Sequence, residues 1–185
     1  MTMTATEPAL MTADEFFARY PDHLKELVKG VVQEVAMPGT EHGAVNANVI
    51  YYLSVHARKH DVGRLLSNDT FFLTGTGPDS VRGMDVAYIS YARLPKGPLP
   101  RGILLAIPEL VVEVRSPTDL WTELFAKVEE YLAAGVAVVV ILDPRSRMAS
   151  VIRPGPSQLD LTDADTLVIP DVLPGFAVPV ARLFE

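Results

Sequence analysis

The chain has 185 residues, 49% of them hydrophobic, and a formal net charge of −7 at pH 7. This length suits one domain with a substantial core, and the lack of cysteine excludes disulfides and thiolate metal sites, as in proteins of a reducing cytoplasm. The acidic balance counts against a broad nucleic-acid-binding surface but allows an acidic pocket that holds cations. The longest apolar run, residues 136–142, is too short to cross a bilayer, and the first residues do not have the form of a secretory signal. We therefore expect a cytoplasmic protein without a membrane segment.

The first part of the chain predicts a helix, a hairpin and a longer helix. Thr12 and Glu15 have the spacing of a capping box, so a helix is expected over residues 12–21. Weak alternation of apolar residues around Lys29-Gly30 indicates a hairpin. Over residues 43–60 apolar side chains recur at steps of three and four, which is typical of a helix with one buried face.

The rest of the chain predicts strands that are interrupted by one further helix. We expect strands at residues 64–73, 84–90 and 109–116, a Pro-rich loop at 93–108, a helix at 118–135, a buried strand at 136–144 and short strands in the tail. The cap of the third helix is expected at Thr118 or Asp119. This order favours an α/β fold, with a mixed sheet flanked by helices, an N-terminal helix and hairpin, and a strand-containing C-terminal tail. Residues 1–10 are expected to be disordered and residues 11–185 to form one domain.

Asp85 and Glu113 each lie in the middle of an apolar run that predicts a strand. An ionised carboxylate in a buried strand is costly unless it is paired or binds a metal. Because side chains alternate along a strand, Glu113 shares a face with Val111 and Arg115, and Asp85 shares one with Ala87. If the two strands are neighbours, the two acids converge at one edge of the sheet. Two carboxylates, with waters and a backbone carbonyl, suit Mg²⁺ or Mn²⁺ and leave open positions for a substrate phosphate.

Lys127 is the basic residue of the helix that follows the strand of Glu113. It is four residues from both Glu123 and Tyr131, so the three side chains share one helix face. A lysine beside two carboxylates that bind a metal can position the attacking water or stabilise the charge of the transition state. The two acids and this lysine therefore predict metal-dependent phosphodiester cleavage.

Each of these residues also has an explanation without catalysis. Asp85 could pair with Arg82 or Arg115, Glu113 could pair with Arg115 on its own face, and Lys127 could be a solvated helix residue. His56 and His60 lie four residues apart on a helix, but no third ligand stands at an obvious spacing, so zinc is disfavoured. The basic cluster of Arg58, Lys59, His60 and Arg64 could contact phosphate or form a solvated helix end.

Several motifs together resemble the Uma2 family, which is assigned to the restriction endonucleases within the PD-(D/E)XK nuclease superfamily. Its order of motifs is matched here by Asp85 and Glu113 as the two acids, Ser116-Pro117, Lys127 and Tyr131 on the helix, Gly135-Val136 and Asp143-Pro144. LMTADEFFA, the hairpin segment ELVKG and the ending PGFAVPVARLF are similar to further family segments. The resemblance spans nearly all of residues 10–185.

This resemblance implies a restriction-endonuclease-like fold and hydrolysis of DNA phosphodiesters with Mg²⁺ or Mn²⁺. It implies the following roles: Asp85 and Glu113 as metal ligands, Lys127 as a catalytic residue, Glu26 as a supporting catalytic carboxylate, and His42, Tyr131 and Arg115 as second-tier site residues. Arg115 occupies the position where the superfamily pattern has its lysine. His42 is expected just before the long helix.

Departures from the family pattern keep other functions open. Met84 replaces the proline before the first acid, and Val31 replaces a glutamate after Gly30. The alternatives are a catalytically inactive scaffold or binding module with the nuclease fold, and a hydrolase of another phosphate ester. A homodimer is expected, because cleavage of both strands of DNA needs two sites.

Overall fold

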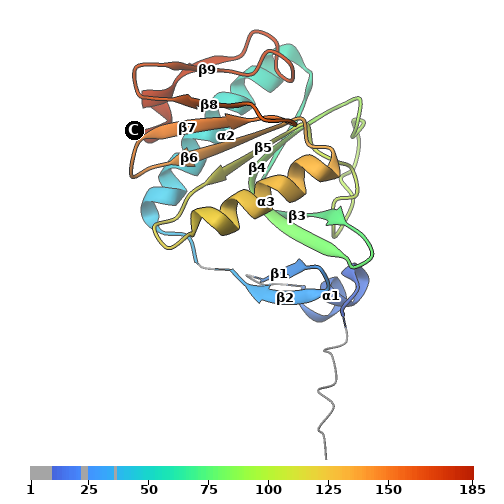
Figure 1. Ribbon diagram of the computed structural model, residues 1–185. Helices are drawn as coiled ribbons and strands as arrows, with labels where there is room; N and C mark the ends of the chain where they lie inside the picture. The colour runs from blue at the N-terminus through green and yellow to red at the C-terminus, as the bar shows by residue number, and fades with distance from the viewer. Residues whose placement is uncertain (1–9, 22–24, 36) are drawn as a thin grey trace, which may run out of the picture.

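The computed structural model describes residues 10–21, 25–35 and 37–185. Most of its strands form one long sheet, and helices lie against that sheet (Figure 1). Helix α1 (Ala13–Arg19) begins with the predicted capping box. The Thr12 hydroxyl accepts from the Glu15 amide at 3.3 Å, and the Glu15 carboxylate accepts from the Thr12 amide at 2.9 Å. Disorder was predicted for residues 1–10, and of these only Leu10 is among the described residues. That residues 11–185 form one domain stays a prediction.

A tight hairpin joins β1 (Lys25–Val28) to β2 (Val31–Glu34), as the sequence predicts. Its two turn residues both have positive φ, +49° at Lys29 and +77° at Gly30. Two consecutive positive φ values define the type I′ turn, whose twist matches that of the flanking strands. The hairpin places Glu26 on its inner strand.

Helix α2 (Thr40–His60) begins three residues earlier than the sequence predicted. His42 is therefore part of its first turn and is buried, which corrects the prediction that His42 lies before the helix. The predicted apolar stripe is present, with Val45, Val49 and Leu53 buried on one face. The stripe fixes α2 on the sheet and so fixes the direction in which His42 points.

The main sheet is mixed and has the order β2-β1-β4-β5-β6-β7-β8, with β3 paired to β4. Its further strands are β3 (Gly63–Gly75), β4 (Ser80–Ser90), β5 (Leu110–Val114), β6 (Val138–Asp143), β7 (Met148–Ile152) and β8 (Gln158–Leu161). β5 and β6 are parallel and are joined across one face of the sheet by α3 (Trp121–Ala134), whereas the other pairs of this sheet are antiparallel. The predicted mixed α/β sheet is confirmed.

Helices cover both faces of the sheet, so its central strands are buried on both sides. β6 is buried along its whole length, as predicted. Val112 packs in the cluster that contains α2, while Val111 packs with α3. The tail adds β9 (Thr166–Val168), β10 (Ala177–Pro179) and a 3-10 helix, η1 (Val180–Phe184), beside α2.

The cap of α3 differs from the prediction. Leu120 is the N-cap residue and makes no side-chain capping bond. Asp119 instead accepts a hydrogen bond from the Ser116 amide at 2.7 Å and closes the loop before the helix. Gly135 ends α3 in the left-handed conformation, with φ +104°, as its place in the sequence indicates. Within the described residues, none of the helices is long and apolar enough to cross a membrane.

β1 and β5 share one edge of β4, and this arrangement opens the cleft described below. β3 pairs along the opposite edge of β4, from Ser80 to Ser90. β1 pairs with β4 at Val81, and β5 pairs with it from Val86 to Tyr88. The segment of β4 between these two partners, residues 82–85, is therefore unpaired on that edge and accessible to side chains from both neighbouring strands.

Candidate active site

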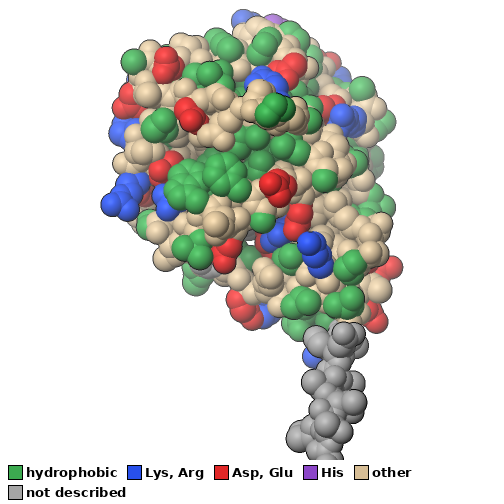
Figure 2. Space-filling view, viewed as in Figure 1, with side chains coloured by type: hydrophobic (Ala, Val, Ile, Leu, Met, Phe, Trp, Pro, Cys, Tyr) green, Lys and Arg blue, Asp and Glu red, His purple; other side chains and the backbone are tan. Residues whose placement is uncertain are grey.

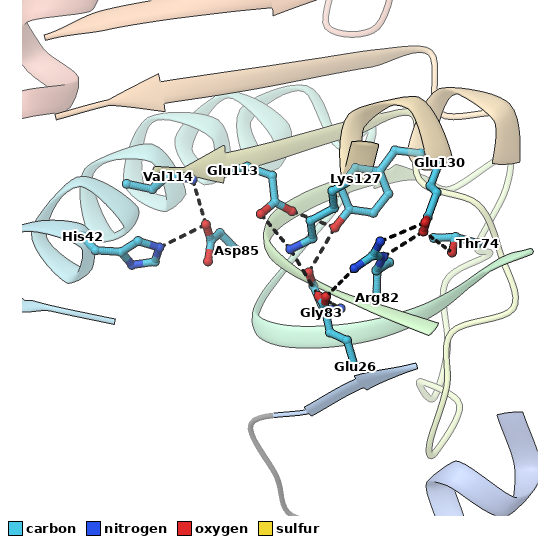
Figure 3. A network of polar contacts seen from close by, with 11 residues as sticks. Glu26, His42, Thr74, Arg82, Gly83, Asp85, Glu113, Val114, Lys127 and Glu130 are labelled. Carbon is cyan, nitrogen blue, oxygen red and sulfur yellow. Dashed lines mark hydrogen bonds and ion pairs between the residues drawn. The ribbon is translucent and has the colours of Figure 1, made fainter. Parts of the chain in front are cut away.

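Asp85 and Glu113 meet across β4 and β5, as strand alternation predicted. Val86 pairs with Val112, so the register continued by one residue sets Asp85 opposite Glu113. Asp85 Oδ2 accepts from the Val114 amide at 2.7 Å and lies 3.1 Å from His42 Nε2 (Figure 3). Neither contact uses Oδ1. Asp85 is therefore held by β5 and by α2, and neither Arg82 nor Arg115 pairs with it.

Lys127 lies between two carboxylates that come from different strands (Figure 3). Its Nζ is 3.0 Å from Glu113 Oε2 and 3.2 Å from Glu26 Oε1. The Tyr131 hydroxyl, one helix turn further, lies 2.7 Å from Glu113 Oε1 and 3.0 Å from the carbonyl oxygen of Gly83. The structure thus brings Glu26, Lys127 and Tyr131 to the site through Glu113.

A further ion-pair network, which the sequence did not predict, joins Arg82 to Glu130 and to Glu26. Arg82 donates two hydrogen bonds to Glu130, at 2.7 and 2.8 Å, and one to Glu26 Oε2 at 2.8 Å. The Gly83 amide donates to Glu26 Oε1 at 3.0 Å. Glu130 lies three residues after Lys127, on an adjacent part of α3, and this spacing was the available signal.

Arg115 does not join the group. Its guanidinium donates to the Asp119 carbonyl oxygen at 3.2 Å, lies 3.5 Å from Asp143 Oδ1 and stacks 4.7 Å from the centre of the Trp121 ring. The alternative of a Glu113–Arg115 ion pair is therefore wrong. The second-tier residues separate accordingly: His42 and Tyr131 contact the two acids, whereas Arg115 contacts Asp143 and Trp121 instead.

Burial and charge shift the pKa values of these groups in different directions. Burial raises the pKa of Glu113 to about 7, with Asp85 acting in the same direction and Lys127 against it. Burial also acts to raise the pKa of Glu26, but Lys127 and Arg82 outweigh it and the net pKa is lowered. Burial acts to lower the pKa of Lys127, but Glu113 and Glu26 outweigh it, so the net pKa is raised and the amine stays protonated.

These residues lie in a cleft of about 860 Å³ between the hairpin, α2 and α3. Its charged lining is mostly acidic: Glu26, Glu34, Asp85, Glu113, Asp119, Glu123 and Glu130 face the cleft together with Lys29, Arg82 and Lys127. Such a cleft attracts cations and repels phosphate, unless bound cations reverse its charge.

The donor set fits a hard divalent cation. In the described part of the chain, His, Cys, Asp and Glu side chains do not gather in threes as ligands of one ion. Mg²⁺ does not need three, because it is commonly held by one or two carboxylates together with waters and substrate phosphates. Asp85 and Glu113 supply two such carboxylates. The raised pKa of Glu113 marks a buried acid whose charge Lys127 does not fully compensate.

The mixed sheet flanked by helices is the fold of a protein described as a putative nuclease. The pattern of the Uma2 family, described as "Putative restriction endonuclease", matches residues 13–181, and the chain belongs to this family. Among solved structures, a protein from Anabaena variabilis ATCC 29413, described as a putative nuclease belonging to DUF820, has the same fold with a TM-score of 0.81. The two are 19% identical over 94% of this chain and 97% of that one. A comparison with curated proteins gave no match.

Proposed function

We propose that the protein is an endonuclease that hydrolyses DNA phosphodiesters with Mg²⁺ or Mn²⁺. The observation that carries this proposal is the position of Lys127 Nζ, 3.0 Å from Glu113, in a cleft that also contains Asp85. Membership of the family and the fold of a nuclease support the reaction class. The metal ion and the DNA substrate are part of the proposal.

Asp85 and Glu113 would hold the ion, which when bound polarises phosphoryl oxygens and lowers the pKa of a water. His42 and the Val114 amide fix the orientation of Asp85 through its Oδ2 atom. Tyr131 fixes Glu113 through Oε1. Ligands whose orientation is set by such neighbours bind a metal with less loss of side-chain entropy.

Lys127 acts as a cation, because the neighbouring carboxylates raise its pKa. An ammonium group has three N–H donors. One is donated to Glu113 Oε2, and Glu26 Oε1 lies 3.2 Å away as an ion pair. A further N–H would then meet an oxygen of the substrate phosphate. We infer that Lys127 stabilises negative charge on the phosphate in the transition state, and that Glu26 positions Lys127.

The test is cleavage of plasmid and linear DNA with Mg²⁺ or Mn²⁺. Asp85→Ala and Glu113→Ala should each abolish cleavage while circular dichroism shows an intact fold. Glu129→Gln, an acid-to-amide change at an exposed position of α3, is the matched control and should cleave normally. Cleavage at the normal rate in both Ala variants would refute the proposal.

A non-catalytic binding module is the second candidate function. Lys127 and Tyr131 engage both oxygens of Glu113, so an ion would have to compete with Lys127. Met84, in the place of the family proline, is fully buried. Titration with Mn²⁺ by calorimetry separates the two functions, because the binding module should bind no ion at micromolar concentration. Sedimentation in the presence of DNA tests the proposed homodimer.

A further inference from the structure

The tip of the β1–β2 hairpin holds a lysine in a conformation that lowers stability. Lys29 has φ +49°, in the left-handed region that side chains other than Asn and Asp seldom adopt. The type I′ turn favours Asn or Asp at this first position and glycine at the second, and Gly30 fills the second with φ +77°. A lysine therefore strains the turn where an asparagine would not, and residues held in such conformations cluster at functional sites.

Three hydrogen bonds hold the backbone of this turn in place. The Lys29 amide donates to the hydroxyl of buried Ser80 at 2.9 Å, and the Gly30 amide donates to the Asp79 carbonyl oxygen at 2.7 Å. The Gly30 carbonyl oxygen accepts from the Met11 amide at 2.8 Å. The turn is thus fastened both to the segment before α1 and to the start of β4, so the Lys29 side chain leaves the backbone at a fixed point.

Lys29 is exposed and lines the cleft that contains Asp85 and Glu113. Figure 2 shows acidic and basic side chains gathered where the hairpin meets the rest of the molecule, in the lower half of the view. The Lys29 ammonium makes no ion pair with any described residue, whereas Arg82 and Lys127, the other basic residues of the lining, are each held between two carboxylates. Lys29 is therefore the cation of the described lining whose charge is still available to a ligand.

The acidic character of the cleft makes such a cation important for a polyanion. Acidic residues outnumber basic ones in the lining, and affinity for DNA comes largely from Lys and Arg contacts to phosphate. A metal ion at the two acids would offset the charge of the scissile phosphate only. Phosphates further along the strand need a cation of the protein, and a lysine ammonium on its flexible stem is suited to that contact.

The position of Lys29 relative to Lys127 decides which phosphate it can meet. Glu26 Oε1 lies 3.2 Å from Lys127 Nζ. Lys29 follows Glu26 by three residues, which at about 3.3 Å per strand residue is roughly 10 Å along β1. Successive nucleotides rise about 3.4 Å along a DNA strand. A phosphate in contact with Lys29 is therefore a neighbour of the scissile phosphate and not the scissile phosphate itself.

We propose that Lys29 binds a DNA phosphate that flanks the scissile phosphodiester and so sets where the strand lies along the cleft. The proposal rests on the proposed nuclease function and adds to it a substrate-binding residue on the hairpin. The contact is electrostatic and is made to the backbone of the DNA, so it reads no base sequence. The hairpin, whose Glu26 positions Lys127, thereby takes a direct part in substrate binding.

The first test is the binding of a labelled duplex oligodeoxynucleotide, followed by anisotropy at several salt concentrations in Ca²⁺, which takes oxygen ligands as Mg²⁺ does. Lys29→Asn removes the charge and supplies a residue that the turn favours. It should bind roughly three- to tenfold more weakly, by a similar factor for any sequence, and the slope of log affinity against log salt should fall by about one. Lys29→Arg keeps the charge and should bind like the wild type. Lys59→Asn, at an exposed residue of α2 outside the cleft lining, removes the same charge and should leave affinity and slope unchanged.

Kinetics and stability separate a binding role of Lys29 from a structural one. With Mg²⁺, Lys29→Asn should raise KM by the factor by which binding weakens and leave kcat within about twofold, because a flanking contact is made equally in the ground state and the transition state. The urea midpoint of Lys29→Asn should be at least that of the wild type, since asparagine relieves the strain at φ +49°.

The proposal is overturned if Lys29→Asn binds DNA with unchanged affinity and salt slope, if Lys59→Asn loses as much, or if the wild type binds no DNA. A urea midpoint of Lys29→Asn well below that of the wild type would assign Lys29 to the fold instead. Cleavage that proceeds in the wild type and is unaffected in Lys29→Asn refutes the role of Lys29 alone. The nuclease function fails separately, if the wild type cleaves no DNA with Mg²⁺ or Mn²⁺ while binding still depends on Lys29, and in that case Lys29 stands as a DNA-binding residue without cleavage.

Discussion

Glu26 and Glu113 share the ammonium group of Lys127, although they lie on two strands that do not pair with each other. The Nζ atom is 3.2 Å from Glu26 and 3.0 Å from Glu113. All three side chains are largely buried. A single cation between two buried carboxylates makes the group electrostatically interdependent, since removal of any member leaves the others poorly compensated.

Lys127→Met should abolish cleavage and also destabilise the fold. Loss of the ammonium leaves two carboxylates buried without it, and removing one partner of a buried ion pair costs about 3 kcal/mol or more of unfolding free energy. Urea unfolding in EDTA measures this cost. Lys96→Met removes an exposed ion pair with Asp61 and should cost at most about 1 kcal/mol. Equal effects of the two substitutions would contradict the interdependence of the buried group.

Glu113→Gln should change how stability depends on pH. Burial raises the folded-state pKa of Glu113 to about 7, from an ordinary value of 4.5. Between these two values the unfolded chain releases the proton and the folded protein keeps it, so Glu113 lowers stability progressively as pH rises from about 4.5 to 7. The full penalty is on the order of 3 kcal/mol.

The measurement compares the unfolding free energies of the wild type and Glu113→Gln at pH 4.5, 6 and 8 in EDTA. The amide cannot ionise, so the difference between the two proteins should shift in favour of the variant as pH rises. Asp160→Asn, at an exposed carboxyl whose pKa is lowered from 3.8 by Ser150 and Gln158, is the control, and its difference from the wild type should stay nearly constant over this pH range. A difference for Glu113→Gln that is constant over this range would show that its carboxyl is not held protonated.

Glu130→Gln should lower kcat about tenfold and leave Mn²⁺ affinity unchanged. Glu130 contacts neither Asp85 nor Glu113 among the hydrogen bonds of the described residues, but it holds Arg82, which in turn holds Glu26. A loosened Glu26 displaces Lys127 from the position in which it meets the phosphate, and small displacements of such a group are costly. Steady-state kinetics and calorimetry give the two values. A parallel loss of metal affinity would place Glu130 in the metal site instead.

His42→Ala should weaken Mn²⁺ binding about tenfold. Its Nε2 lies 3.1 Å from Asp85 Oδ2, and loss of a side chain that orients a metal ligand lowers affinity by roughly 10 to 100-fold. Calorimetric titration is the measurement. His60→Ala, at the exposed far end of the same helix, should bind the ion normally. Unchanged Mn²⁺ affinity in His42→Ala would contradict this prediction and would mean that the Val114 amide alone orients Asp85.

Local patterns in the sequence predicted the elements and the central acids well. The capping box at Thr12 and the turn at Lys29-Gly30 depend on neighbouring residues, so the sequence contains the full information. The strand alternation around Asp85 and Glu113 fixes their faces for any pairing that makes the strands neighbours. Helix spacing and the family resemblance together indicated Lys127, and the resemblance alone added Glu26. The convergence of these two residues depends on the tertiary arrangement.

Local sequence patterns did not predict which residues Arg82 and Arg115 contact. Arg82 turns to Glu26 and Glu130 because β1 pairs with β4 at Val81, and the sequence does not specify this long-range pairing. Arg115 turns to Trp121 because the loop before α3 brings the start of the helix over it. The sequence does not mark the start of α2 and so does not place His42 inside it, because the N-cap residue is Gly39, which has no capping side chain.

The sharing of one edge of β4 by β1 and β5 has a consequence for what a partly folded molecule can do. The paired register between β1 and β4 is limited to Leu27 and Val81, yet Glu26 beside it helps to hold Lys127. A molecule whose hairpin has detached would keep most of its sheet and its circular dichroism signal, but it would have lost the ion pair between Glu26 and Lys127. Under the proposed function, cleavage activity is therefore a stricter criterion of complete folding than secondary-structure content.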